Sequence, residues 1–183
     1  MNKPFSKLPD CVLVEGKNYR INTDFRIWAE LYSFMEGSAP YEQKILKLLL
    51  DGYTNVLPPH LDSAVNALLD FMVQGIDKEN KHSESSDKII SFSQDEGAIY
   101  ASFLSQYGID LFRENLHWWS FINLLNSLDA NTAFMKIISY RTVDCQSIKN
   151  KELRKFYKKM KNKYKITINM NDGEIASVLD SII

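Results

Sequence analysis

Apolar residues three and four positions apart recur through most of this chain, and that spacing constrains the fold more than any other feature. In "VLPPHLDSAVNALLDFMVQG" they form one helical stripe, made of Leu61, Ala64, Val65, Leu68, Leu69 and Met72. Pro58 and Pro59 suit the first turn of this helix. Hydrophobic residues make up 45% of the 183 positions, which is enough for the core of an ordinary domain. We predict a mainly α, multi-helix globular domain.

Further helices follow from the same spacing together with start and stop signals. The segment "TDFRIWAELYSFMEG" has Thr23 or Asn22 as its N-cap and Gly37 as its end, and it is apolar on so many faces that we expect it to be central. "SQDE" at 93–96 is a capping box that opens a helix ending at Gly108. The remaining predicted helices cover 41–50, 116–128, a short stretch capped by Asp129 or Asn131 and ending at Ser139, and 146–164.

Residues 11–21 differ from this pattern, because two β-prone runs lie on either side of "EGKN". Gly16 and Asn18 tolerate the positive φ of a tight turn, so we predict a small N-terminal β-hairpin that packs on helices. A polar loop or linker is expected at 77–91. It separates an N-terminal part, 1–76, from a helical part, 92–165, and we expect the two to pack as one domain. The end, 166–183, is either a docked short helix or a frayed tail.

Motifs that would indicate catalysis or metal binding are absent from the sequence. It has no phosphate-binding loop, dinucleotide fingerprint, zinc-protease helix, nucleophile elbow or EF-hand loop. The histidines His60, His82 and His117 lack ligand spacing, and Cys11 and Cys145 fit free thiols. Asp95 beside Glu96 is explained by the dipole at a helix start. We expect no enzyme activity, no cofactor and no metal.

The overall charge and the hydropathy point to a soluble, intracellular protein. The first residues, "MNKPFSKLPDCVLV", lack the apolar run of a signal peptide, and no segment approaches the roughly 20 apolar residues of a membrane-spanning helix. The net charge of −1 gives no general reason to expect a nucleic acid or a membrane as partner.

One local charge feature stands out, "KNKELRKFYKKMKNKYK" at 149–165, with nine Lys or Arg against the single Glu152. On a helix its apolar residues form a narrow stripe, made of Leu153, Phe156, Tyr157, Met160 and Tyr164. Such a helix either stays solvated while its stripe docks on its own domain, binds an acidic protein face, or binds nucleic acid. The candidate contact residues are Arg154, Lys155, Lys158 and Lys159.

"LHWWSF" at 116–121 places two tryptophans side by side, and a helix turns them in different directions. Trp118 falls on the apolar face and is predicted to be core. His117 also points there, which favours a hydrogen-bonded core histidine over a catalytic base. Trp119 falls near Asn123 and Asn126, so it is either covered by the preceding "GIDLF" loop or exposed as a partner contact.

These segments also carry a family resemblance. "DEGAIYASFLSQYGIDL", "LHWWSFINLLNSL" and "KIISYR" closely resemble the bacteriophage Gp15 family of tailed phages and prophages, and "YRINTDFRIWAEL" is similar to it as well. Residues 77–91 and those after Lys165 match little. The family pattern falls on Tyr107, Gly108, Ile109, Asp110, Leu111, Leu116, His117, Trp118, Trp119, Phe121, Tyr140 and Arg141.

The resemblance brings no catalytic residues, and it implies a role in phage tail assembly. Genes of this family usually lie between those for the tail tube and tape measure proteins, which implies a tail assembly chaperone in the host bacterial cytoplasm. Its implied partner is the tape measure protein, with the tail tube protein second and a homo-oligomer open. Two alternatives remain, a nucleic-acid-binding accessory protein that uses 149–165 and a structural component retained in the tail.

Overall fold

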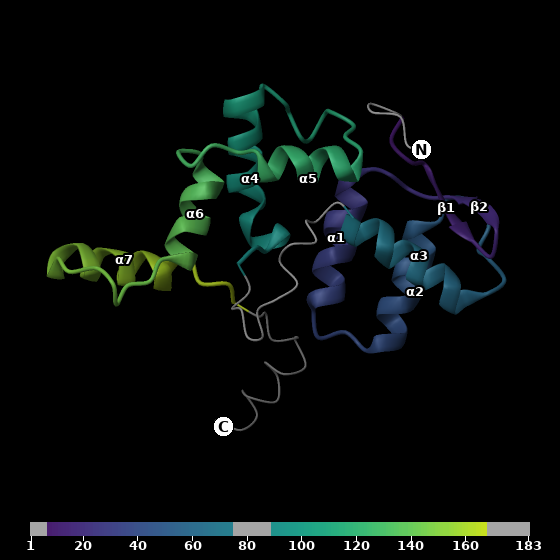
Figure 1. Cartoon of the computed structure of the whole chain (residues 1–183), viewed down its shortest axis with the longest axis horizontal. Helices are drawn as coiled ribbons and strands as arrows, with labels where there is room; N and C mark the ends of the chain where they lie inside the picture. The colour runs from purple at the N-terminus through teal and green to yellow at the C-terminus, as the bar shows by residue number, and fades with distance from the viewer. Residues whose placement is uncertain (1–6, 75–88, 168–183) are drawn as a thin grey trace, which may run out of the picture.

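A computed structural model describes residues 7–74 and 89–167, and within them the chain forms one hairpin and seven helices (Figure 1). The elements are β1 (Cys11–Val14), β2 (Lys17–Arg20), α1 (Phe25–Glu36), α2 (Tyr41–Gly52), α3 (Leu61–Gln74), α4 (Phe92–Tyr107), α5 (Trp118–Asn126), α6 (Ala133–Thr142) and α7 (Lys151–Lys163). The predicted mainly α fold with a small N-terminal hairpin is confirmed. Most of the predicted linker, 77–88, and most of the predicted tail, 168–183, lie outside the described residues.

The hairpin turns through two residues, because Val14 of β1 pairs with Lys17 of β2. Glu15 and Gly16 between them both have positive φ, +48° and +77°, as a tight primed turn requires. The prediction was right for Gly16 and wrong for Asn18, which pairs with Leu13 within the ladder. β1 packs on α3, so the helices support this two-stranded ribbon.

Helix α1 lies at the centre of the molecule and contacts α2, α4 and α5. Its N-cap is Asp24, whose carboxylate accepts a hydrogen bond from the Arg26 amide at 2.9 Å, so the helix begins one residue later than Thr23 would give. The predicted end at Gly37 is correct. Trp28 on this helix is fully buried, and its indole N–H donates to the carbonyl of Asn22 at 2.8 Å.

Two backbone hydrogen bonds join the start of α1 to the start of α5. The amide of Phe25 donates to the carbonyl of Leu116 at 3.0 Å, and the amide of Trp118 donates to the carbonyl of Thr23 at 2.7 Å. The Phe25 ring then stacks on Phe121 with 4.6 Å between ring centroids. Segments some 90 residues apart therefore share one aromatic core, and α5 begins two residues later than predicted.

Helices α2 and α3 cross at Gly52, the last residue of α2. A Cβ at this glycine would lie 2.7 Å from a methyl carbon of Leu68, so the close approach favours glycine. The predicted helix at 41–50 is thus two residues longer. Pro58 and Pro59, predicted in the first turn of α3, precede it instead, because the helix begins at Leu61 with the carbonyl of His60 accepting from the Ala64 amide.

Helix α4 begins at Phe92, because its N-cap is Ser91 and not the predicted Ser93. The Ser91 hydroxyl accepts from the Gln94 amide, while the Ser91 amide donates to the carboxylate of Asp95 at 3.0 Å. At the other end, Gly108 adopts a left-handed φ of +69°, as predicted.

Helix α6 starts at Ala133, and its N-cap is Thr132 where Asp129 or Asn131 was predicted. The Thr132 side chain makes no capping bond. The hydroxyl of Ser102 on α4 accepts a hydrogen bond from the Phe134 amide at 3.0 Å. A neighbouring helix therefore supplies the acceptor for an amide in the first turn of α6. The helix runs to Thr142, three residues past the predicted end at Ser139.

Candidate functional site

The basic segment forms helix α7, which projects from the body of the molecule at the end opposite the hairpin (Figure 1). It begins at Lys151, five residues later than predicted, because the side chain of Asn150 accepts from the Leu153 amide at 3.0 Å. Just before it, the Asp144 carboxylate accepts from the Gln146 amide. Such short side chains offer the backbone an alternative to helix, which accounts for the late start.

An aromatic cluster centred on Tyr140 of α6 holds α7 in place. The Tyr140 ring stacks on Tyr164 at 5.6 Å and approaches Tyr157 and Phe156 at 6.2 and 6.3 Å. Helix α6 is the element against which α7 packs, and α7 has no fully buried residue. The helix is therefore an arm attached along one side only.

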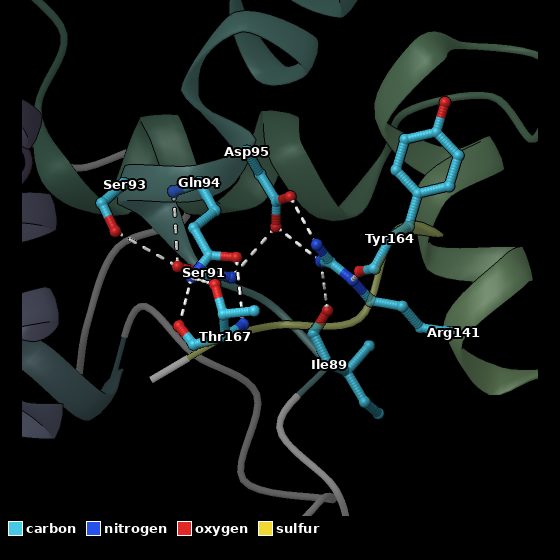
Figure 2. Close-up of polar contacts among 8 residues, drawn as sticks. All are labelled: Ile89, Ser91, Ser93, Gln94, Asp95, Arg141, Tyr164 and Thr167. Atoms are coloured by element: carbon cyan, nitrogen blue, oxygen red, sulfur yellow. Dashed lines mark hydrogen bonds and ion pairs between the residues drawn. The ribbon is translucent and has the colours of Figure 1, made fainter. Parts of the chain in front are cut away.

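A buried ion pair fixes the root of this arm. Figure 2 shows the Arg141 guanidinium facing the Asp95 carboxylate, with N–O distances of 2.6 and 2.7 Å. The same guanidinium donates to the carbonyl of Tyr164 at 2.7 Å and to that of Ile89 at 2.8 Å. These side chains are 2% exposed for Asp95 and 7% for Arg141. Because Tyr164 directly follows α7, this cluster ties the arm to the start of α4.

Sequence reasoning missed this role of Asp95, which it had attributed to the helix dipole. The sequence signal was available, since Asp95 lies one turn before Ile99, a core residue. A carboxylate on an apolar face needs a buried partner. Nothing in the sequence identified that partner as Arg141, 46 positions away.

The four cations proposed for partner binding divide into two kinds. Arg154 is half-buried, and its guanidinium donates to the carbonyl of Ile148 at 2.8 Å, so it helps to position the loop before α7. Lys155, Lys158 and Lys159 are exposed and make no ion pair within the described residues. These three lysines belong to the exposed positive charge of α7, to which Lys151 and Lys163 also contribute.

The apolar stripe of α7 is covered over only half its length. Tyr157, Met160 and Tyr164 are half-buried, whereas Leu153 and Phe156 remain 48% and 46% exposed. The alternative in which the stripe docks on its own domain is therefore met by the second half of the helix only. Together with the three lysines, the two exposed side chains form what we call the arm face.

Trp119, the other candidate contact, is half-buried, and its indole is already hydrogen-bonded and stacked within the protein. Its indole N–H donates to the carbonyl of Phe71 at 2.9 Å, and its ring stacks on that phenylalanine at 5.2 Å. The element that holds Trp119 is α3, whereas the sequence pattern suggested the loop 108–112. Its remaining edge lines a cavity of about 250 Å³ beside Val12 and Ala67. A contact role for Trp119 stays a prediction.

Replacing Trp119 with phenylalanine tests how far this residue supports the fold. The change keeps a ring on Phe71 but removes the donor to its carbonyl, so we expect the free energy of unfolding to fall by about 0.5–1.5 kcal/mol. Urea unfolding measures it. Tyr41→Phe, which removes an exposed hydroxyl on α2, is the control and should stay within about 0.5 kcal/mol of wild type. Equal stability of both variants would contradict a structural role for the indole N–H.

His117 caps α5, a role that the sequence did not indicate. Its Nδ1 accepts from the Trp119 amide at 3.1 Å, and its Nε2 lies 2.9 Å from the carbonyl of Pro9. The ring is half-buried and hydrogen-bonded. Trp118, the next residue, is fully buried as predicted, with its indole N–H donating to the carbonyl of Met72 at 3.0 Å.

The other residues of the resemblance pattern lie mainly at the connection from α4 to α5. The hydroxyl of Tyr107 donates to the carbonyl of Leu124 at 2.8 Å, and burial, with a smaller contribution from Asp129, raises the pKa of this phenol. Asp110 accepts from the Phe112 amide in the following turn. The side chains of Ile109, Leu111, Leu116 and Phe121 join the core. This part of the pattern is structural.

The described residues form neither a metal-binding cluster nor a membrane-spanning helix. Across 7–74 and 89–167, no group of three or more His, Cys, Asp or Glu side chains is arranged to hold a metal ion. Within the same ranges, no helix combines the length and apolar character needed to cross a bilayer. The arm face on α7 is a candidate site for a macromolecular partner, because it combines exposed apolar and cationic side chains.

Comparison with known proteins identifies a protein family for this chain. Searches among curated proteins and among solved structures return no match. The family described as "Bacteriophage Gp15 protein" matches residues 5–166, which include the whole hairpin and all the helices described above. This protein therefore belongs to the bacteriophage Gp15 family.

Proposed function

We propose that this protein is a non-enzymatic phage tail morphogenesis factor, a tail assembly chaperone that binds the tape measure protein in the host cytoplasm. Membership of the Gp15 family supports a phage role, and the resemblance set out above points to the tape measure protein, with the tail tube protein as a second partner. A tape measure chain exposes apolar helical faces before the tube surrounds it. Covering those faces would prevent aggregation.

The observation that carries this proposal is the arm face. Leu153 and Phe156 lie one turn apart on α7 and remain about half exposed beside Lys155, Lys158 and Lys159, three exposed lysines with no ion pair to another described residue. Helices that bind other helices use such anchors at i and i+3, with charges around them. The arm face therefore suits an amphipathic helix with acidic residues beside its apolar stripe.

Co-expression with fragments of the tape measure protein tests the proposal. Wild-type protein should keep the fragments soluble, and Leu153→Ser with Phe156→Ser should reduce the soluble amount. Because truncating a central apolar anchor costs about 1–2 kcal/mol, the pair should weaken binding about tenfold or more. Titration calorimetry with a soluble fragment measures that loss directly.

A matched control comes from α2, where Leu46 and Leu50 are also exposed and lie outside the arm face. Leu46→Ser with Leu50→Ser removes the same kind of surface and should leave fragment solubility at the wild-type level. If the fragments precipitate equally with and without the wild-type protein, the chaperone role is wrong.

A nucleic-acid-binding role is the second candidate, and the exposed Lys155, Lys158 and Lys159 favour it. Binding to phosphates would weaken steeply as salt increases. Absence of DNA binding even at low salt would remove this candidate. Mass spectrometry of purified virions distinguishes a third role, because a structural tail component would be present there and a chaperone absent.

A further inference from the structure

A groove of about 340 Å³ lies between α1 and α4, on a surface that the family comparison does not assign. Its floor is apolar and consists of Phe25, Ile99 and Phe121, all core residues. At its lip, Phe112 is 64% exposed and contacts Tyr100 in a tilted arrangement, with 4.8 Å between ring centroids. The volume falls within the roughly 300–1,000 Å³ of typical binding pockets, and an exposed aromatic at the lip is typical of a docking surface.

The rim of this groove presents negative charge. Glu96 on α4 is exposed and has no ion pair within the described residues, and Glu30 on α1 is exposed beside its partner Lys47. The two other charged residues of the rim are already paired, Arg26 with Asp24 and Glu30 with Lys47, each at 2.8 Å, so Glu96 provides the unbalanced negative charge. The groove therefore favours an apolar segment flanked by cations over an acidic one.

The chain itself contains such a segment, because its charges are unevenly distributed. Residues 149–165 hold nine of the 22 Lys and Arg and one of the 23 Asp and Glu, a net charge of +8. The rest of the chain has 13 cations and 22 acids, a net charge of −9. Two copies therefore attract each other when the arm of one faces the body of the other.

We propose that the α1–α4 groove binds helix α7 of a second copy of this chain. Leu153 and Phe156 enter the apolar floor, and the lysines of the arm face lie against Glu30 and Glu96. The arm cannot reach its own groove, because the Tyr140 cluster and the hydrogen bond from Arg141 to Tyr164 hold it on the far side of α6 (Figure 1). Two copies that exchange arms form a closed pair, whereas one-way contacts would continue into a chain of copies.

Both proposals use the arm face, so an arm bound to a second copy is not free to bind a tape measure chain. Self-association of the purified protein is measured with no other partner present, so its outcome can be told apart from that of the co-expression experiment. Sedimentation velocity of the full-length protein over a dilution series tests it. We expect self-association at 0.1 M salt that weakens about tenfold or more at 1 M, since the screening length falls from about 10 Å to about 3 Å. A protein that is monomeric at every concentration in low salt would overturn the proposal.

Charge reversal identifies the two surfaces. Glu30→Lys with Glu96→Lys reverses the groove, and Lys155→Glu with Lys158→Glu reverses the arm. Each variant alone should be monomeric. An equimolar mixture should associate again, because the positive groove of one variant then meets the negative arm of the other. Circular dichroism confirms that both variants fold.

A matched control reverses acids outside the groove, Glu42 and Asp62, which are also exposed. Glu42→Lys with Asp62→Lys should associate as wild type does. Two results would contradict the proposal: groove or arm variants that associate like wild type, which would place the contact elsewhere, and a mixture that stays monomeric.

Discussion

Replacing Arg141 with alanine is expected to lower the free energy of unfolding by about 3–5 kcal/mol, because it leaves the carboxylate of Asp95 buried without its counter-charge. That carboxylate is 2% exposed and, among the residues that the structure describes, retains only the Ser91 amide as a donor. The carbonyls of Ile89 and Tyr164 lose their donors as well. Urea unfolding followed by circular dichroism measures the loss.

The matched control is Lys136→Ala, which removes an exposed cation from the same helix and should change stability by no more than about 0.5 kcal/mol. A double-mutant cycle with Asp95→Ala isolates the pair, since the second substitution removes the stranded charge and should restore part of the stability lost by Arg141→Ala. Equal losses for the Arg141 and Lys136 variants would show that the buried pair does not hold the root of the arm.

Trp118→Ala is expected to cost a similar amount, about 3–5 kcal/mol, through a cavity in the aromatic core. The indole is fully buried, approaches Phe92 and Phe121 at 5.9 Å each, and donates to the carbonyl of Met72. The substitution also removes this hydrogen bond. Denaturant midpoints, compared at equal slope, measure the loss.

Tyr41→Ala serves as the control for Trp118→Ala, since Tyr41 is a large aromatic residue that is mostly exposed on α2. Its removal should change stability by no more than about 0.5 kcal/mol. A loss below about 1 kcal/mol for Trp118→Ala would mean that the indole does not pack as described.

Residues whose signal is local were predicted well. Gly108 was expected to end a helix because a left-handed residue favours glycine, and it does so with φ of +69°. Trp118 was placed in the core from its position on the apolar face of a helix, and it is fully buried. Both conclusions depend on residues within one or two turns.

Errors arose where several residues could make the same local contact. Ser91 and Ser93 are both suitable N-caps, and Ser91 caps α4 because its amide also bonds to the buried carboxylate of Asp95. Similarly, α6 starts at Ala133, where the hydroxyl of Ser102 on α4 accepts a hydrogen bond from the Phe134 amide. No sequence pattern near Asp129 could indicate that contact.

The sequence by itself determined the number of helical segments in the described chain, the apolar face of most of them and the concentration of positive charge at 149–165. These features repeat every three to four residues, so a single segment contains them. Only the tertiary structure decided that Asp95 pairs with Arg141, that α3 holds Trp119, and that Leu153 and Phe156 stay exposed while Tyr157 is half-buried. Each of these depends on a contact between residues far apart in the chain, and periodicity within one helix contains no information about which neighbour covers it.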